Sequence, residues 1–210
     1  MESAGGKLFD RKIFARIKRE EINVKELQET INSFREKYDY NLVLYDTINE
    51  EIVDRYVEIY NQARIDMNRY NPDKPDIIKR TKEDVYKKLS WDKGPLDKMF
   101  LYVLFDKEII AGFCSLFVRD ENKNMIDQAG GLTTVNKNYR GQNIAKFLKS
   151  KIYLKMLEKY PDFDFIRTDT YPWNKYMYRI NEQMGFKPYE VYSEIKFGIA
   201  DIEKYLSQKV

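Results

Sequence analysis

Apolar residues recur at helical spacing in two segments of the N-terminal half of the chain. Between residues 24 and 38 they are Leu27, Ile31 and Phe34, which lie three or four positions apart among charged residues. Over residues 52–67 a second helical face consists of Ile52, Tyr56, Ile59, Tyr60, Ala63 and Met67. This spacing predicts two amphipathic helices. A shorter helix is expected over residues 81–89, after a loop that contains Pro72 and Pro75.

Strand patterns dominate the middle of the chain. After a short strand N-L-V-L-Y at residues 41–45, three apolar runs rich in β-branched and aromatic residues fill residues 99–135, as in an antiparallel meander. The pattern then predicts a helix over 142–159, a strand over 165–170, a helix over 173–184 ended by Gly185, a strand over 189–197 and a tail helix. Strand, helix, strand order makes the two strands parallel. The sequence therefore predicts an α/β (α+β) fold with a mixed central sheet flanked by helices.

Composition narrows the class of protein. The 210 residues include 37 basic and 34 acidic side chains, so the net charge of +3 offers no electrostatic footprint for nucleic acid or a membrane surface. The single cysteine, Cys114, lies in an apolar run and is expected to be a buried structural residue. The sequence shows no signal peptide, no long apolar run and no lipidation motif, from which we expect a cytoplasmic protein.

Histidine is absent, and its absence restricts the chemistry that the chain can perform. Catalytic triads that use histidine, histidine-ligated zinc and imidazole bases are all excluded. Acid and base roles must fall on Asp, Glu, Tyr or Lys. No calcium-loop motif or comparable carboxylate cluster is visible, so no metal site is expected.

The segment N-Y-R-G-Q-N-I-A, residues 138–145, joins a predicted strand to a predicted helix. Such a junction gathers backbone N–H groups that have no intrahelical partner, at the end of the helix where the dipole is positive. The sequence therefore predicts an anion-binding turn here, with Gly141 supplying conformational freedom.

The elements are accompanied by motif residues in a fixed order: Thr133-Thr134-Val135, Tyr139-Arg140-Gly141, Ile144-Ala145, Thr168, Asn174, Met177, Asn181 and Gly185-Phe186. This order resembles the GNAT superfamily of acyl-CoA-dependent N-acyltransferases over roughly residues 40–200. The chain resembles in particular the C-terminal half of tandem members related to mycothiol synthase. The resemblance implies the GNAT fold, in which two parallel strands splay apart.

The resemblance also implies that the anion is the pyrophosphate of acetyl-CoA. Its turn would be formed by Arg140, Gly141, Gln142, Asn143, Ile144 and Ala145. The chain departs from the family motif at Asn138 and Asn143, where the motif has other residues. Asparagine nevertheless tolerates a positive φ. Backbone groups of Thr133 and Val135 would bind the pantetheine arm, and N–H groups near Leu132 and Thr133 would polarise the thioester carbonyl. Asn174 and Asn181 would lie along the arm, although Asn174 could equally be a helix cap.

Catalytic residues are expected by the same resemblance. Asp127, eleven residues before Asn138, lies where several GNAT branches carry a catalytic carboxylate, and a solvent-facing or turn-capping role is an equal alternative. Glu190 and Glu194 are the other candidates for the base. Tyr178 is the candidate proton donor to the departing thiolate, because Asn181 occupies the usual tyrosine position and cannot act as an acid.

The sequence therefore predicts an N-acetyltransferase that transfers acetyl from acetyl-CoA to a primary amine of a small molecule by direct attack. The alternatives are a protein or peptide N-acetyltransferase and a non-catalytic acyl-CoA-binding module. Residues 1–38 are expected to form a helical extension and residues 39–210 the GNAT domain, as a monomer or homodimer. Six aromatic residues either line an acceptor cleft or belong to the core: Tyr56, Tyr60, Tyr70, Trp91, Tyr171 and Trp173.

Overall fold

A computed structural model describes residues 7–68, 77–92, 98–119 and 122–200, together with residues 203 and 207. Its strands are β1 (Lys7–Lys18), β2 (Asn41–Tyr45), β3 (Lys98–Asp106), β4 (Ile109–Arg119), β5 (Asn122–Asp127), β6 (Thr133–Val135), β7 (Phe165–Thr170) and β8 (Lys187–Lys196). Its α-helices are α1 (Val24–Arg35), α2 (Val53–Asn68), α3 (Lys82–Asp92), α4 (Ile144–Lys159) and α5 (Lys175–Gln183). Two 3₁₀ turns, η2 (Arg19–Glu21) and η3 (Lys137–Tyr139), complete the described elements.

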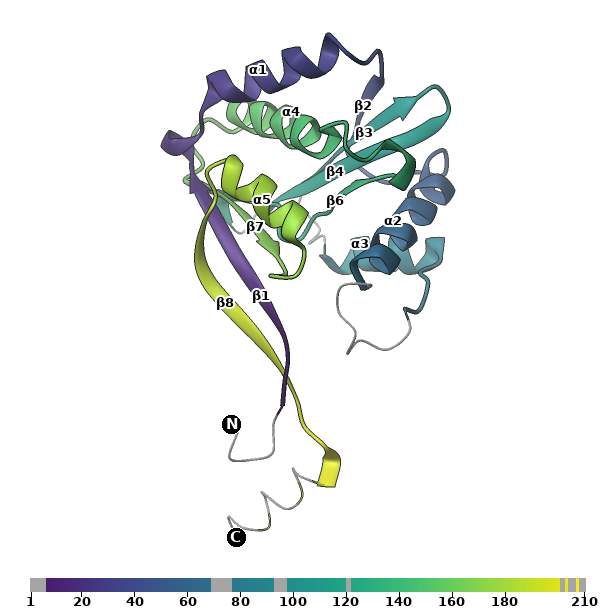
Figure 1. Cartoon of the computed structure of the whole chain (residues 1–210), viewed down its shortest axis with the longest axis vertical. Helices are drawn as coiled ribbons and strands as arrows, with labels where there is room; N and C mark the ends of the chain where they lie inside the picture. The colour runs from purple at the N-terminus through teal and green to yellow at the C-terminus, as the bar shows by residue number, and fades with distance from the viewer. Residues whose placement is uncertain are drawn as a thin grey trace.

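The described strands form one mixed sheet in the order β2-β3-β4-β5-β7-β1-β8, with β6 paired to β4 (Figure 1). All neighbouring pairs are antiparallel except β5 and β7, which are parallel. The predicted meander and the predicted mixed α/β fold are both confirmed.

Helices cover both faces of the central strands, which explains why β3 and β4 are almost entirely buried. On one face α4 packs on the sheet and α1 packs on α4, where the rings of Phe34 and Phe147 lie 4.1 Å apart. On the other face α2 packs on β4 through contacts such as Tyr56 with Phe113. Residues of β4 alternate between these two clusters, with Cys114 on the α4 side and Phe113 on the α2 side.

The parallel strands β5 and β7 separate partway along their length. Their pairing runs from Met125 opposite Phe165 to Asp127 opposite Arg167, and ends with the amide of Gln128, which donates to the Arg167 carbonyl at 2.8 Å. Residues 128–132 then lead into β6, which pairs with β4 and with no other strand in the described ranges. A gap therefore opens between β6 and the second half of β7, and this is the splay expected of the GNAT fold.

The expectation of a helical segment over residues 1–38 is wrong for residues 7–18. These residues form β1, which is inserted between β7 and β8 and pairs antiparallel with both. Its buried residues Ala15 and Ile17 are two apart, a strand period rather than a helical one. The predicted helix is present as α1, with Leu27, Ile31 and Phe34 all buried. Residues 1–6 lie outside the described ranges.

Other expectations can be compared briefly with the structure. The helix predicted from residue 142 begins at Ile144, because Gly141 and Asn143 both have positive φ. The loop with Pro72 and Pro75 and most of the expected tail helix lie outside the described residues. No helix in the described part of the chain combines the length and apolar character needed to cross a membrane.

Candidate active site

The turn before α4 adopts a conformation that few residues tolerate. Arg140 is extended, Gly141 has a φ of 83°, and Asn143 is left-handed with a φ of 61°. A Cβ at Gly141 would meet no atom within 4 Å, so the backbone angle and not crowding requires glycine there. Asparagine is among the residues that reach the left-handed region most readily, which agrees with its predicted role at position 143.

This turn presents unpaired backbone donors at the start of a 16-residue helix. The first amide of α4 to make an intrahelical bond is that of Phe147, which donates to the Asn143 carbonyl at 3.0 Å. None of the N–H groups from Gly141 to Lys146 donates a hydrogen bond to any residue that the structure describes. The first turn of the helix carries no acidic residue. We refer to residues 141–146 as the amide cradle, and its chemistry suits a phosphate group.

Side chains around the amide cradle hold it to the rest of the fold. Tyr139 donates its hydroxyl to Asp106 Oδ2 at 2.9 Å, and this bond raises the pKa of Tyr139. Tyr40 donates to Gln142 Oε1 at 3.0 Å, and Arg140 forms an ion pair with Asp66 on α2. The side chains of Arg140 and Gln142 therefore support the turn, so a cofactor contact predicted for either residue would use its main chain.

Strand β6 presents backbone groups to the gap between the strands. Strands β4 and β6 pair with Phe113 opposite Thr134. Two residues further along β4, the Ser115 amide donates to the Leu132 carbonyl at 2.9 Å, so Leu132 and Thr134 are the positions that face β4. Bonded positions alternate in an antiparallel pair, so the N–H groups of Thr133 and Val135 point away from β4 and toward the gap. This is the orientation that the predicted pantetheine contact requires.

Leu132 does not fit the role predicted for it. Its amide donates to Ser115 Oγ at 2.9 Å, so the N–H is already used. The amide of Thr133 is the better candidate to polarise a carbonyl in the gap.

Two of the predicted cofactor-binding residues belong to α5, Asn174 as its N-cap and Asn181 within it. Asn174 caps the helix by accepting the Met177 amide at 3.4 Å, which supports the capping alternative for this residue. Asn181 is 3% exposed, and neither its amide nitrogen nor its amide oxygen has a hydrogen-bond partner in the described part of the protein. A buried amide without partners is costly, and a polar ligand beside α5 would supply them.

A buried polar cluster lies between α4 and the bulge that precedes β6. Lys149 Nζ donates to Gln128 Oε1 at 2.6 Å, and the Tyr153 hydroxyl donates to the same oxygen. Gln128 Nε2 in turn donates to Cys114 Sγ at 3.1 Å and to Thr133 Oγ1 at 3.5 Å. Burial lowers the pKa of Lys149 to about 8 and raises that of Cys114. Cys114 is fully buried, as predicted.

Asp127 lies on the opposite face of the sheet, where two arginines hold its carboxylate. Arg119 donates to Oδ2 from Nε at 3.3 Å and from Nη2 at 3.2 Å, and Arg167 donates to Oδ1 at 3.3 and 3.1 Å. The Gly130 amide also donates to Oδ1, at 3.2 Å. A general base needs a free lone pair, so these contacts favour a structural role for Asp127 over its predicted role as the base.

Three further candidate residues differ in their surroundings. Glu190 and Glu194 are exposed on β8. Tyr178 is half-buried on α5, and its hydroxyl has no hydrogen-bond partner among the described residues. Sequence reasoning missed Asp169 on β7, which is largely buried and forms an ion pair with Lys12 of β1. The sequence feature that could have identified Asp169 is its position in the predicted strand that follows α4.

The aromatic residues proposed to line a cleft divide into two groups. Tyr56 is buried and stacks on Phe113 at 4.4 Å, so it belongs to the core, and Tyr60 stacks on Tyr56. Tyr171 and Trp173 stack on each other at 4.7 Å in the loop between β7 and α5. Tyr70 and the side chain of Trp91 lie outside the described part of the structure.

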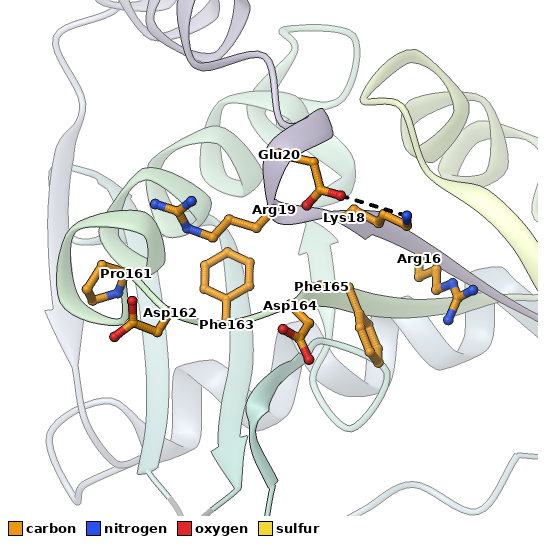
Figure 2. A pocket seen from close by; sticks show the side chains of 9 residues that line it. All are labelled: Arg16, Lys18, Arg19, Glu20, Pro161, Asp162, Phe163, Asp164 and Phe165. Atoms are coloured by element: carbon orange, nitrogen blue, oxygen red, sulfur yellow. Dashed lines mark ion pairs between the residues drawn. The ribbon is translucent and has the colours of Figure 1, made fainter.

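A surface pocket of about 500 Å³ lies elsewhere in the molecule (Figure 2). It is bounded by the end of β1, η2 and the segment between α4 and β7, at the opposite end of α4 from the amide cradle. A 16-residue helix is about 24 Å long, so the pocket is remote from the gap. Its lining includes Arg16, Lys18, Glu20 and Asp164. The described residues contain no group of three or more acidic, histidine or cysteine side chains placed to hold a metal ion.

Comparison with known proteins gives structural similarity without sequence similarity. No protein-family model matches the sequence, and no curated protein matches it. Among solved structures, a tandem GNAT protein from the clavulanic acid biosynthesis pathway has a TM-score of 0.72 at 16% identity, covering 91% of this chain and 55% of that one. A GCN5-related N-acetyltransferase from Sphaerobacter thermophilus has a TM-score of 0.58 at 13% identity, covering 92% and 53%.

A GCN5-related N-acetyltransferase-like protein from Streptococcus suis has a TM-score of 0.54 at 14% identity, covering 93% of this chain and 64% of that one. The chain thus spans 53% to 64% of the length of these three structures. The similarity covers 91% to 93% of this chain. This chain has the GNAT fold.

Proposed function

We propose that this protein is an N-acetyltransferase that transfers the acetyl group of acetyl-CoA to a primary amine of a small molecule. One observation carries the proposal: the unpaired N–H groups of the amide cradle lie directly downstream of the unpaired edge of Thr133 and Val135. A phosphate site joined to a free strand edge matches a ligand that has a pyrophosphate at one end and an amide-containing arm at the other.

The residues of the site fit acetyl-CoA. The amide cradle would hold the pyrophosphate, and the main chain of Thr133 and Val135 would pair with the pantetheine amides as an added strand does. Asn181, buried without partners, would gain a hydrogen bond from the same arm. The thioester would then reach the gap between β6 and β7, where the Thr133 amide can polarise its carbonyl.

Direct attack by the amine is the simplest chemistry for this site. An alkylammonium with a pKa near 10.4 is neutral in about one molecule in a thousand at pH 7, an obstacle of roughly 5 kcal/mol. A carboxylate on the acceptor side would remove much of it by taking the proton. A covalent route through Cys114 is not supported, because burial raises the pKa of that thiol and its sulfur lies within the core.

Two measurements test the proposal. Calorimetry with CoA and acetyl-CoA tests the cofactor site, and release of free CoA in the presence of amines tests turnover. The amine panel should contain polyamines, arylalkylamines, amino acids and a lysine-containing peptide. Turnover with a small amine supports the proposal, whereas turnover confined to the peptide favours a protein acetyltransferase. Binding of CoA without turnover would indicate a binding module, and no binding would contradict the site.

A further inference from the structure

The strand edge that faces the gap carries a second carboxylate, Asp169. It lies two residues beyond Arg167, the last residue of β7 that pairs with β5. In β7 the buried residues Ile166, Thr168 and Thr170 alternate with Arg167 and Asp169. Ile166 belongs to the cluster beneath α4, so Asp169 points to the opposite face, where Asp127 also lies.

Asp127 and Asp169 have different partners. The oxygens of Asp127 are occupied by two guanidinium groups and an amide, and its side chain is 3% exposed. Among the residues that the structure describes, Asp169 forms an ion pair with Lys12 alone, and its side chain is 14% exposed. Asp169 therefore keeps acceptor capacity and access to solvent, which Asp127 lacks.

Lys12 belongs to β1, which the N-terminal segment inserts beside β7. Its side chain is 33% exposed, and Nζ lies 5.6 Å from the centre of the Phe14 ring and 5.9 Å from that of Tyr171. Phe14 pairs with Asp169 on one side and with Glu190 on the other, so these three residues share one face of the sheet. These residues form a partly aromatic face on the side of the sheet opposite α4.

We propose that Asp169 is the general base for the acceptor amine, and that Lys12 of the N-terminal strand is a positioning residue that controls its basicity. The inference rests on the proposed function and adds the residue that performs its proton transfer. Asp169 accepts the ammonium proton and releases it to solvent. The neutral amine nitrogen then bonds to the thioester carbon and gives a second proton to the Asp169 carboxylate. The carbon–sulfur bond then breaks, and CoA leaves as the thiolate.

The electrostatic surroundings of Asp169 suit this role. Burial raises its pKa, while the neighbouring cation of Lys12 opposes the rise. The negative charge of Asp127 on β5 also raises the pKa of Asp169. The positive charge of Arg167 on β7 lowers it, as Lys12 does. Lys149 on α4 also interacts electrostatically with Asp169, and Glu190 on β8 shares its face. A carboxylate with a raised pKa is a better proton acceptor near neutral pH than an ordinary one.

Steady-state kinetics of the full chain with acetyl-CoA and the best amine of the panel test the assignment. Asp169→Asn should lower kcat/KM by about a hundredfold or more without changing acetyl-CoA affinity in calorimetry. Asp169→Glu, which keeps the carboxylate, should retain more activity than Asp169→Asn. Glu36→Gln is the control, because it removes an exposed carboxylate at the C-terminal end of α1, outside the sheet, and should leave the rate within about threefold.

The pH profile separates a role in catalysis from a role in folding. Lys12→Met removes the cation that favours the ionised form of Asp169, so the acidic limb of kcat/KM should move to higher pH. An unmoved limb in this variant would overturn the role of Lys12. A folded Asp169→Asn variant with nearly the original rate would overturn the base assignment while leaving the proposed function intact. A wild-type protein that binds acetyl-CoA and turns over no amine would contradict both.

Discussion

Arg167 Nη2 lies 3.1 Å from Asp127 Oδ1, across the last rung of the parallel pair β5 and β7. Arg119 holds the other carboxylate oxygen from the neighbouring strand β4. The Asp127 side chain is 3% exposed, so this is a buried ion-pair network at the point where the strands separate. The negative charge at this position thus keeps two guanidinium groups paired beside the gap.

Asp127→Asn should destabilise the protein. The variant keeps the shape of the side chain but leaves two arginines without a buried counter-charge, and breaking such a pair typically costs about 3–5 kcal/mol. Urea unfolding should therefore show a lower free energy, while Glu190→Gln, an exposed carboxylate, should show little change. A stable Asp127→Asn variant with a hundredfold loss of kcat/KM would instead restore its predicted role as the base.

Replacing Gly141 should weaken CoA binding. Gly141→Val places a β-branched residue at a φ of 83°, which costs on the order of 1–2 kcal/mol, and projects a side chain toward the amide cradle. Calorimetry should show a loss of affinity of tenfold or more. Gly185→Ala is the control, because Gly185 has a similar φ of 86° at the end of α5, away from the cradle. Equal affinity of a folded Gly141→Val variant for CoA would refute the site.

Lys149→Met should stabilise the protein near neutral pH. Lys149 is 1% exposed, and burial lowers its pKa from an ordinary value of 10.5 to about 8. The shift corresponds to a cost of about 3 kcal/mol for keeping the charge buried. Methionine fills a similar volume, and Gln128 Oε1 keeps the hydrogen bond from Tyr153. Thermal or urea unfolding at pH 7 should show a gain, and a clear loss of stability would contradict this account.

The pH dependence of stability gives an independent check on Lys149. Because the pKa is lower in the folded state, the unfolded chain binds the proton more tightly. The penalty is therefore fully present below pH 8 and is relieved as the pH rises from about 8 toward 10.5. The stability difference between Lys149→Met and the wild type should shrink over this range. A difference that stays constant from pH 7 to 10 would show that the buried amine does not titrate.

Tyr178→Phe should have a small effect on turnover. A phenol has a pKa near 10 and a thiol near 8.5, so complete proton transfer from tyrosine to the leaving thiolate is uphill by about 2 kcal/mol and can add little to the rate. We expect kcat to fall by less than about tenfold. Tyr176→Phe, at a 78% exposed position on the same helix, should leave kcat unchanged. A hundredfold loss in Tyr178→Phe alone would make proton donation by this residue a main source of rate acceleration.

Local patterns predicted much of the fold and the anion site. The helix of residues 24–35 follows from Leu27, Ile31 and Phe34, because helical periodicity depends on neighbours within a few positions. The left-handed turn follows in the same way from Gly141 and Asn143, whose backbone preferences are intrinsic. The strand, helix, strand order around Arg140 was enough to predict the parallel pair.

The tertiary structure decided what depends on distant partners. β1 pairs with β7 and β8, which lie far along the chain, and no local rule states that Lys12 will meet Asp169. The same holds for the arginines around Asp127, which turn a candidate base into a paired structural charge. The sequence by itself therefore determined most of the elements after β1 and the left-handed turn before α4. Only the packing of the sheet decided how each carboxylate is buried and ion-paired, because these contacts arise between strands that the sequence keeps apart.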